Sequence, residues 1–240
     1  MKASLLLVLA LSFAVGCRAD FRQAVVDYGA GRYGEAVHEL YPLAEQGNPR
    51  AQLMLAGIYY NGRGLAQDYG QAMLWYRKAA EQGSAAAQDA LANMYFQGQG
   101  TPRDDVQALH WLRLAADQGY ALAQADLGQA YSTGRGVAPD DAQALLWTRK
   151  AADKGCARAV TALGLMYLDG KGLAADPVQA VQLLKQAAQL GDAGAAEALG
   201  RLYEQGRAVA PDKAEALKWY GMAARLGSAE GAAAQQRLMQ

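Results

Sequence analysis

The chain has too few cysteines and histidines for most metal, redox or nucleophilic sites. Its 240 residues include two cysteines and two histidines. His38 and His110 have no partner at the spacing of a catalytic triad or a metal site. A disulfide between Cys17 and Cys156 would have to join an N-terminal tail to the middle of the chain, so we expect Cys156 to be a small, partly buried residue. The sequence therefore predicts no catalytic residue, no metal and no cofactor.

Charge of one sign and long apolar runs are also scarce. The 23 basic and 23 acidic residues cancel, and no basic stripe interrupts this balance. The sequence therefore offers no clustered positive charge that could bind nucleic acid by counterion release, and we expect no nucleic-acid partner. The one long apolar stretch is Ala3–Val15. It is too short to span roughly 30 Å of hydrocarbon, so no membrane-spanning helix is expected.

The first 19 residues are typical of a cleaved export signal, because Lys2 precedes the apolar stretch. The end of this segment, Ala14-Val15-Gly16-Cys17, resembles the lipobox of bacterial lipoproteins. That resemblance implies lipidation of Cys17 and a membrane association made only through the lipid, and Arg18 then favours the outer membrane facing the periplasm. Cleavage after Ala19 is the alternative, and it would leave a soluble periplasmic or secreted protein.

Repetition dominates the rest of the chain. A 36-residue phrase restarts without insertion at Asn48, Ser84, Tyr120, Cys156 and Asp192. Its copies align one column of tyrosines, one of tryptophans with a single leucine, one of aspartates and two of glycines. The tyrosine column is Tyr59, Tyr95, Tyr131, Tyr167 and Tyr203, and the tryptophan column is Trp75, Trp111, Trp147, Leu183 and Trp219. Such a period predicts a solenoid in which each unit buries its apolar face against its neighbours.

Each copy predicts two antiparallel helices. In the first copy, apolar residues recur three and four apart and stop at Gly62, where glycine tolerates the positive φ that ends a helix. Asp68 then caps a second helix, and Gln71 is placed to bond back to it as in a capping box. We therefore interpret the aspartate column as helix caps rather than catalytic groups. The tryptophan and tyrosine columns are interpreted as core.

The repeated phrase resembles the Sel1-like repeat, a relative of the tetratricopeptide repeat. Its pattern is clearest in Gln124, Leu127, Gly128, Tyr131, Gly134 and Gly136, followed by Trp147, Ala151, Ala152 and Gly155. The resemblance implies an all-α fold, an α/α solenoid that winds antiparallel helix pairs into a right-handed superhelix. The expected organisation is an export signal over 1–19, a tetratricopeptide-like helix pair over 20–47, five repeats over 48–227 and a capping helix over 228–240.

By analogy with tetratricopeptide arrays, variable positions of the first helices should line a concave, ligand-binding face. The candidate binding residues on that face are Leu53, Tyr60, Asn93, Phe96, Gln129, Leu165, Leu168 and Arg201. Aromatic and adaptable polar side chains together suit an extended peptide or a partner helix. The alternative is that Tyr60 and Phe96 pack inside the superhelix.

The resemblance implies a non-enzymatic adaptor that binds a partner protein or peptide at the bacterial cell envelope. An envelope polysaccharide or peptidoglycan is the alternative ligand, since an aromatic patch suits a sugar as well as a peptide. A third alternative is a hydrolase, because cysteine-rich Sel1-like proteins with β-lactamase-type activity are known. Those proteins pair cysteines within each repeat, whereas this array contains Cys156 alone, so that activity is not carried over.

Overall fold

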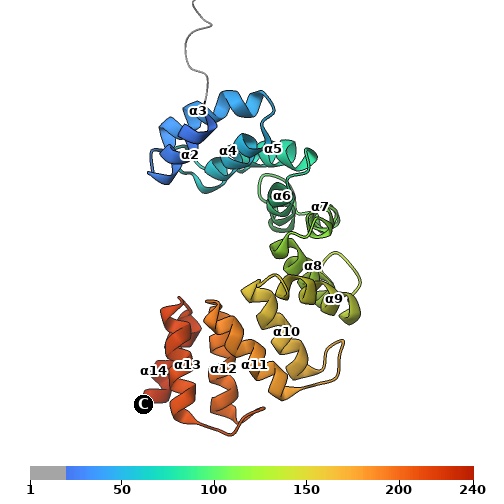
Figure 1. The fold of residues 1–240 in the computed structure, drawn as a ribbon, viewed down its shortest axis with the longest axis vertical. Coiled ribbons are helices and arrows are strands. Elements are labelled where there is room, and N and C mark those ends of the chain that lie inside the picture. The colour runs from blue at the N-terminus through green and yellow to red at the C-terminus, as the bar shows by residue number, and fades with distance from the viewer. Residues whose placement is uncertain (1–19) are drawn as a thin grey trace, which may run out of the picture. The chain divides into compact units, whose positions relative to one another are not determined.

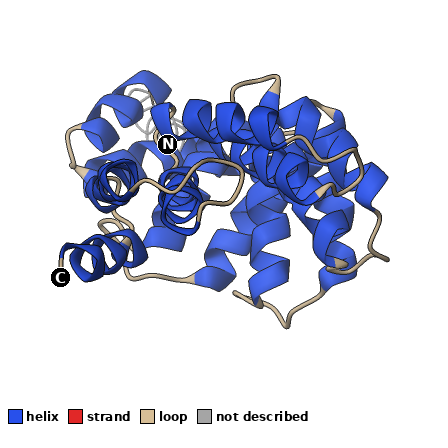
Figure 2. Ribbon diagram, turned by 90° about the horizontal axis from the view of Figure 1, so that it is seen from below, coloured by secondary structure: helices blue, strands red, loops and turns tan. Residues whose placement is uncertain are grey.

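The computed structural model describes residues 20–240, which form thirteen helices, α2 to α14, and no strand (Figures 1 and 2). The proposed export signal and Cys17 lie outside these residues. Within them, no helix is both long and apolar enough to cross a lipid bilayer. The described residues are all-α, and within each of the two units described below consecutive helices pack together as a helical solenoid requires.

The chain divides into two compact units at Arg103 and Asp104. The first unit contains five helices: α2 (Phe21–Gly29), α3 (Tyr33–Glu45), α4 (Pro49–Asn61), α5 (Tyr69–Glu81) and α6 (Ala85–Gln97). The second contains eight: α7 (Asp105–Asp117), α8 (Ala121–Thr133), α9 (Asp141–Ala152), α10 (Ala157–Asp169), α11 (Pro177–Gln189), α12 (Ala193–Gln205), α13 (Lys213–Arg225) and α14 (Ala229–Met239). In the second unit, α12 packs on α13 and also contacts α10 and α14, so first helices of neighbouring repeats lie together.

The predicted punctuation of the repeats is confirmed at both ends of the helices. Each first helix ends at a glycine in the left-handed conformation, with φ between 65° and 72° at Gly62, Gly98, Gly134, Gly170 and Gly206. Each second helix begins after an aspartate whose side chain accepts from backbone N–H groups, namely Asp68, Asp104, Asp140, Asp176 and Asp212. These contacts satisfy donors that would otherwise lack a partner in the first turn.

The prediction of the second bond of the capping box, the return bond from Gln71, is wrong. Gln71 was expected to bond back to the N–H of Asp68, but that N–H donates to the carbonyl of Tyr59 at 3.0 Å. The same bond joins Asp140 to Tyr131, and it recurs in the last two repeats. The aspartate N–H therefore links the start of each second helix to the first helix of the same repeat. Because this N–H is already bonded to a backbone carbonyl, it requires no side-chain acceptor.

Buried glutamines tie one repeat to the next. Gln52, Gln88 and Gln124 each donate from Nε2 to a carbonyl at the end of the preceding second helix, at 3.0 Å in all three cases. Carbonyls in the last turn of a helix lack an intrahelical partner, so each amide satisfies one of them. Around these ties the core consists mainly of alanine and leucine, which let the helices approach closely.

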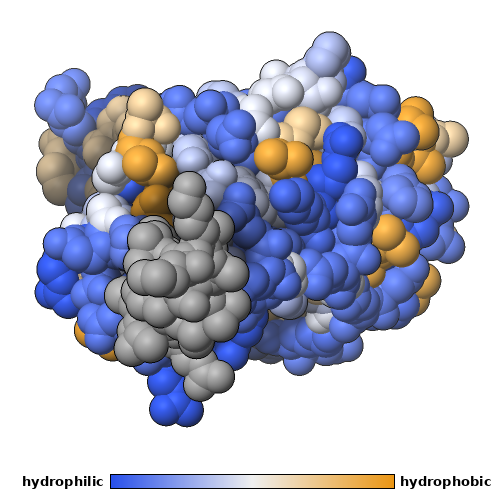
Figure 3. Space-filling view, turned by 90° about the horizontal axis from the view of Figure 1, so that it is seen from above, coloured by the Kyte–Doolittle hydropathy of each residue, from blue (hydrophilic) through white to orange (hydrophobic). Residues whose placement is uncertain are grey.

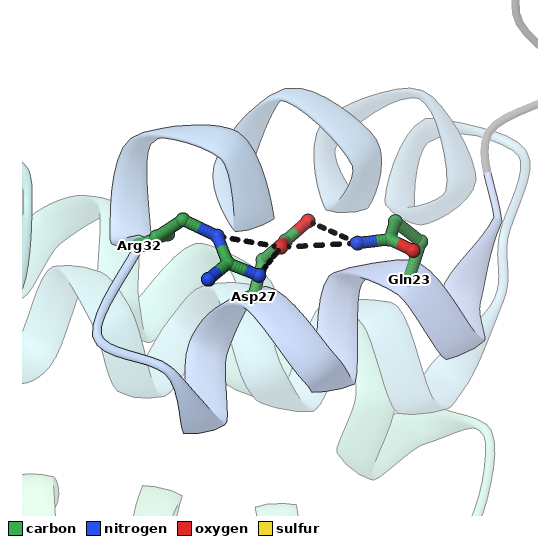
Figure 4. Close-up of polar contacts among 3 residues, drawn as sticks. All are labelled: Gln23, Asp27 and Arg32. Carbon is green, nitrogen blue, oxygen red and sulfur yellow. Dashed lines mark hydrogen bonds and ion pairs between the residues drawn. The ribbon is translucent and has the colours of Figure 1, made fainter.

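The N-terminal helix pair is held by a buried carboxylate (Figure 4). Asp27 on α2 is 5% exposed and accepts from Gln23 Nε2, with 3.0 Å to each carboxylate oxygen. Arg32, in the turn before α3, donates to the same group from Nε at 3.0 Å. Hydrogen bonds from Gln23 and then Arg32 lower the pKa of Asp27. The arrangement fixes the turn between the first two helices.

Candidate functional site

The predicted binding residues of the first unit are mostly engaged within it. Tyr60 on α4 packs its ring 5.3 Å from that of Tyr69 and 6.4 Å from that of Tyr76, and its hydroxyl donates to Gln99 Oε1 at 2.9 Å. Phe96 on α6 is only 6% exposed. Phe96 therefore exposes little surface to a ligand, whereas Tyr60 is half-buried and engaged by its neighbours.

The two remaining candidates of the first unit are half-buried. Leu53 lies on α4, six residues before Tyr59 of the tyrosine column. Asn93 on α6 turns its Nδ2 back to the carbonyl of Asp89, 3.1 Å away on the same helix.

Two predicted residues of the second unit, Gln129 and Leu165, come together in a pocket of about 180 Å³. We call this the α8/α10 pocket. Gly128 and Ser132 of α8, Thr148 of α9, and Leu165 and Met166 of α10 also line it. Asp169 and Lys171, at the end of α10, supply charge at the edge. The pocket thus combines an apolar wall with polar groups of both signs.

The α8/α10 pocket depends on a close approach between α8 and α9. A Cβ atom added to Gly128 would lie 2.5 Å from Thr148 Oγ1 and 3.2 Å from the carbonyl oxygen of Ala144. Only glycine allows this contact without displacement of α9. Thr148 is 3% exposed, so its side chain is held inside the repeat.

The other two candidates of the second unit lie elsewhere. Leu168 is half-buried and packs against the core around α11 and α12. Arg201 lines a separate hollow of about 410 Å³ between α12 and α14, and its Nη1 is 3.3 Å from Glu197. Arg201 is exposed, while Leu168 is part of the packing.

The hollow at Arg201 contains a polar network that sequence reasoning did not identify as a site. Tyr220 is buried at 1% exposure and donates its hydroxyl to Glu204 at 2.6 Å. Arg237 of α14 bonds to the other oxygen of Glu204 at 2.5 Å. Burial, and then the bond to Glu204, raise the pKa of Tyr220. The two arginines and two glutamates of the hollow balance in charge, so it favours no anion or cation.

The described residues contain no group of three or more histidine, cysteine or acidic side chains placed to bind a metal ion. His110 is exposed and stacks edge-on against Trp111 at 5.4 Å. His38 is exposed as well, and its Nδ1 lies 3.9 Å from Glu39. Cys156 is a half-buried free thiol. None of these side chains lines the α8/α10 pocket.

One face of the molecule carries small, separate apolar patches within a mainly hydrophilic surface (Figure 3). Large apolar patches mark many interaction sites, and the described residues visible in this view form only small ones. Two of the predicted residues, Gln129 and Leu165, lie together in one concave pocket.

The model of the Sel1 repeat matches the chain five times, over residues 49–84, 85–120, 121–156, 157–192 and 193–228. A Sel1 repeat protein from Oxalobacter formigenes is similar in structure, with 34% identity and a TM-score of 0.82, over 90% of this chain and 86% of that one. A protective antigen from uropathogenic Escherichia coli strains gives 31% identity and a TM-score of 0.72, over 88% of this chain and 50% of that one. An immunity protein from Pseudomonas aeruginosa gives 25% identity and a TM-score of 0.54, over 74% and 68%. The comparison with curated proteins found no match.

Proposed function

Because this chain belongs to the Sel1 repeat family, whose repeats commonly scaffold protein interactions, we propose that it is a non-enzymatic adaptor that binds a partner protein on the faces of its first helices. The observation that carries the proposal is the α8/α10 pocket, which joins Gln129 and Leu165. These are variable positions on the first helices of two successive repeats. An extended segment that crosses both helices would contact both side chains.

The mixed chemistry of the pocket supports a protein ligand over a purely apolar one. Leu165 and Met166 give an apolar wall, whereas Gln129, Asp169 and Lys171 can bond to the amide and carbonyl groups of a peptide backbone. Ligand sites commonly combine an apolar lining with a few polar groups that fix orientation. Arg201, one repeat further on, provides an additional polar contact for a longer segment.

Site-specific photocrosslinking tests the proposal. A photoreactive phenylalanine analogue is placed at Gln129 or at Arg201, and in control variants at Leu146 or at His110, all four of which are exposed. Leu146 and His110 lie on second helices, α9 and α7. Irradiation of cells should give the same protein adduct from the two test positions and none from the controls.

Two outcomes contradict the proposal. Adducts of equal yield from test and control positions would show that the partner does not bind one particular face of the protein. An absence of adducts at both test positions would show that the first helices are not the binding surface. An adduct that a glycosidase shortens, and a protease does not, would instead support the polysaccharide alternative.

We also propose that the adaptor is exported and anchored at the outer membrane by a lipid on Cys17. Support comes from the sequence of the leader, with Lys2, its apolar stretch and Arg18 after the cysteine. Metabolic labelling with palmitate should mark the protein and the Cys156→Ser control, and Cys17→Ser should abolish the label. A labelled Cys17→Ser variant, or an unlabelled native chain that remains soluble in the periplasm, would favour cleavage after Ala19.

A further inference from the structure

At two positions that line the α8/α10 pocket, the third repeat has smaller residues than the other repeats. We call these the post-tyrosine and post-tryptophan positions, after the column residue that each follows. The post-tyrosine residues are Tyr60, Phe96, Ser132, Leu168 and Glu204. The post-tryptophan residues are Tyr76, Leu112, Thr148, Leu184 and Tyr220. Ser132 and Thr148 are the smallest members of their sets, and they occur in the same repeat.

An aromatic ring occupies the post-tryptophan position in the first and last repeats. In the first, Tyr76 is 8% exposed and its ring lies 6.4 Å from that of Tyr60. In the last, Tyr220 packs on Gly200, because a Cβ added to that glycine would lie 2.6 Å from Cδ1 of the ring. The geometry of the repeat therefore accommodates a phenol ring beside the first helix.

The hydroxyl of Tyr220 also shows where a bound phenol would find an acceptor. It donates to Glu204, which occupies the post-tyrosine position of its own repeat. In the third repeat that position is Ser132, and Ser132 lines the pocket. A serine hydroxyl accepts a hydrogen bond as well as donating one, so it can replace the carboxylate as partner of the phenol.

The size of the pocket agrees with this occupant. Its volume is about 180 Å³, and an apolar protein cavity of about 150 Å³ is known to bind benzene. Leu165 and Met166 lie on one side of the pocket, and a methionine thioether makes favourable contacts with an aromatic ring.

We propose that the α8/α10 pocket binds one tyrosine side chain, presented by an extended segment of the partner protein. The ring replaces the internal ring that Thr148 lacks, and the phenol hydroxyl bonds to Ser132. Gln129, Asp169 and Lys171 at the edge bond to the backbone on either side of the tyrosine. This inference rests on the proposed adaptor function and names the side chain that the adaptor recognises.

The test is a titration of the native protein with N-acetyl-L-tyrosinamide, followed by NMR at the Gly128 amide and the Met166 methyl group. We expect saturable shifts with this probe and weaker binding of the phenylalanine analogue, which lacks the hydroxyl. The alanine analogue should bind at least about tenfold more weakly, because it buries no ring.

Two substitutions fill the pocket with residues that the chain itself uses at the same positions. Thr148→Leu introduces the residue of the second and fourth repeats, and Ser132→Phe introduces that of the second. Each should weaken tyrosinamide binding about tenfold or more, since the ring loses its site. Leu146→Phe, on the same helix but exposed, is the matched control and should bind as the native chain does. Circular dichroism and thermal melting establish that each variant is folded.

The inference is overturned if the native chain shows no saturable shift, if the alanine analogue binds equally well, or if binding survives in both filled variants. These outcomes are independent of the crosslinking test. Crosslinks from Gln129 without tyrosinamide binding would contradict the tyrosine pocket and still support the adaptor function. An absence of crosslinks, together with specific tyrosinamide binding, would contradict the adaptor function and indicate a pocket for a small molecule.

Discussion

Ala208 is expected to destabilise the last repeat, and Ala208→Gly should relieve this. Among the described residues, Ala208 is the one non-glycine with a positive φ, which is 68°. The other four repeats have glycine at this position, with φ between 70° and 72° at the three that follow the first helices α6, α8 and α10. The repeat therefore requires the left-handed conformation here, whatever residue occupies the position.

The expected gain follows from two opposing terms. The left-handed conformation costs an L-residue roughly 1–2 kcal/mol. Glycine does not have this cost, but it loses about 0.4–1 kcal/mol relative to alanine, because an unfolded chain with glycine has more conformations to give up on folding. Ala208→Gly should therefore raise the free energy of unfolding by about 0.5–1 kcal/mol.

Gly172→Ala is the matched reverse substitution. Gly172 has a φ of 71°, and an added Cβ would lie 2.5 Å from the carbonyl oxygen of Asp141. Overpacking of this kind costs about 1–3 kcal/mol. Added to the cost of the left-handed conformation and reduced by the about 0.4–1 kcal/mol that alanine gains over glycine through the unfolded chain, it should lower the free energy of unfolding by about 1–5 kcal/mol.

Urea unfolding monitored by far-UV circular dichroism measures both changes, provided that the slope of free energy against denaturant stays constant. Ala208→Gly should move the midpoint up and Gly172→Ala should move it down. The reasoning fails if Ala208→Gly is neutral or destabilising, because positive φ would then carry no cost at this position. It also fails if Gly172→Ala is harmless.

Three further predictions concern caps and buried ionisable groups. Asp140→Ala should lower the free energy of unfolding by about 1 kcal/mol, whereas Asp140→Asn keeps an N-cap acceptor and should have little effect; urea midpoints decide. Hydrogen bonds from Gln23 and Arg32 lower the pKa of Asp27 in the folded protein. Their contribution to stability is therefore fully present above the pKa of the unfolded chain and is lost as pH falls through the pKa of the folded one. Asp27→Asn should flatten the decline of the urea midpoint at acid pH. An unchanged decline would show that another carboxylate causes it. Burial raises the pKa of Tyr76 to about 12. Because unfolded tyrosine titrates near about 10, stability should fall as pH rises above that value, and less steeply in Tyr76→Phe; equal slopes would contradict the assignment.

The arrangement of helices could be predicted from the sequence because its signals are local. The turn at Gly62 and the cap at Asp68 depend on backbone groups a few residues away, and both are confirmed. The bond from the Asp68 N–H to Tyr59 could not be predicted in the same way. It depends on how the chain returns after the loop, which no pattern of residue types specifies.

The candidate site was predicted less well, because helix phase says which residues share a face and not how deeply each is buried. Phe96 and Gln129 are both on first helices, yet Phe96 is buried and Gln129 is exposed. The network of Tyr220 and Arg237 arises only when α14 packs beside α12. A usable signal for the α8/α10 pocket was present in the aligned repeats, as the coincidence of Ser132 with Thr148.

That coincidence explains how a repeat protein can acquire a specific site without loss of its fold. Gly128, Gly164 and Gly200 occupy one column, and each brings a first helix close to its second helix. At Gly164 the nearest atom is from Leu184, and at Gly200 it is from Tyr220, so the space beside the glycine is filled. At Gly128 the nearest atom is Thr148 Oγ1, so the space beside this glycine is filled as well, and the shorter threonine side chain lines the α8/α10 pocket. The glycine turn that ends α8 and the aspartate cap that begins α9 are unaltered in the third repeat, since they depend on other positions. Recognition can therefore vary at the post-tyrosine and post-tryptophan positions while the remaining columns maintain the solenoid.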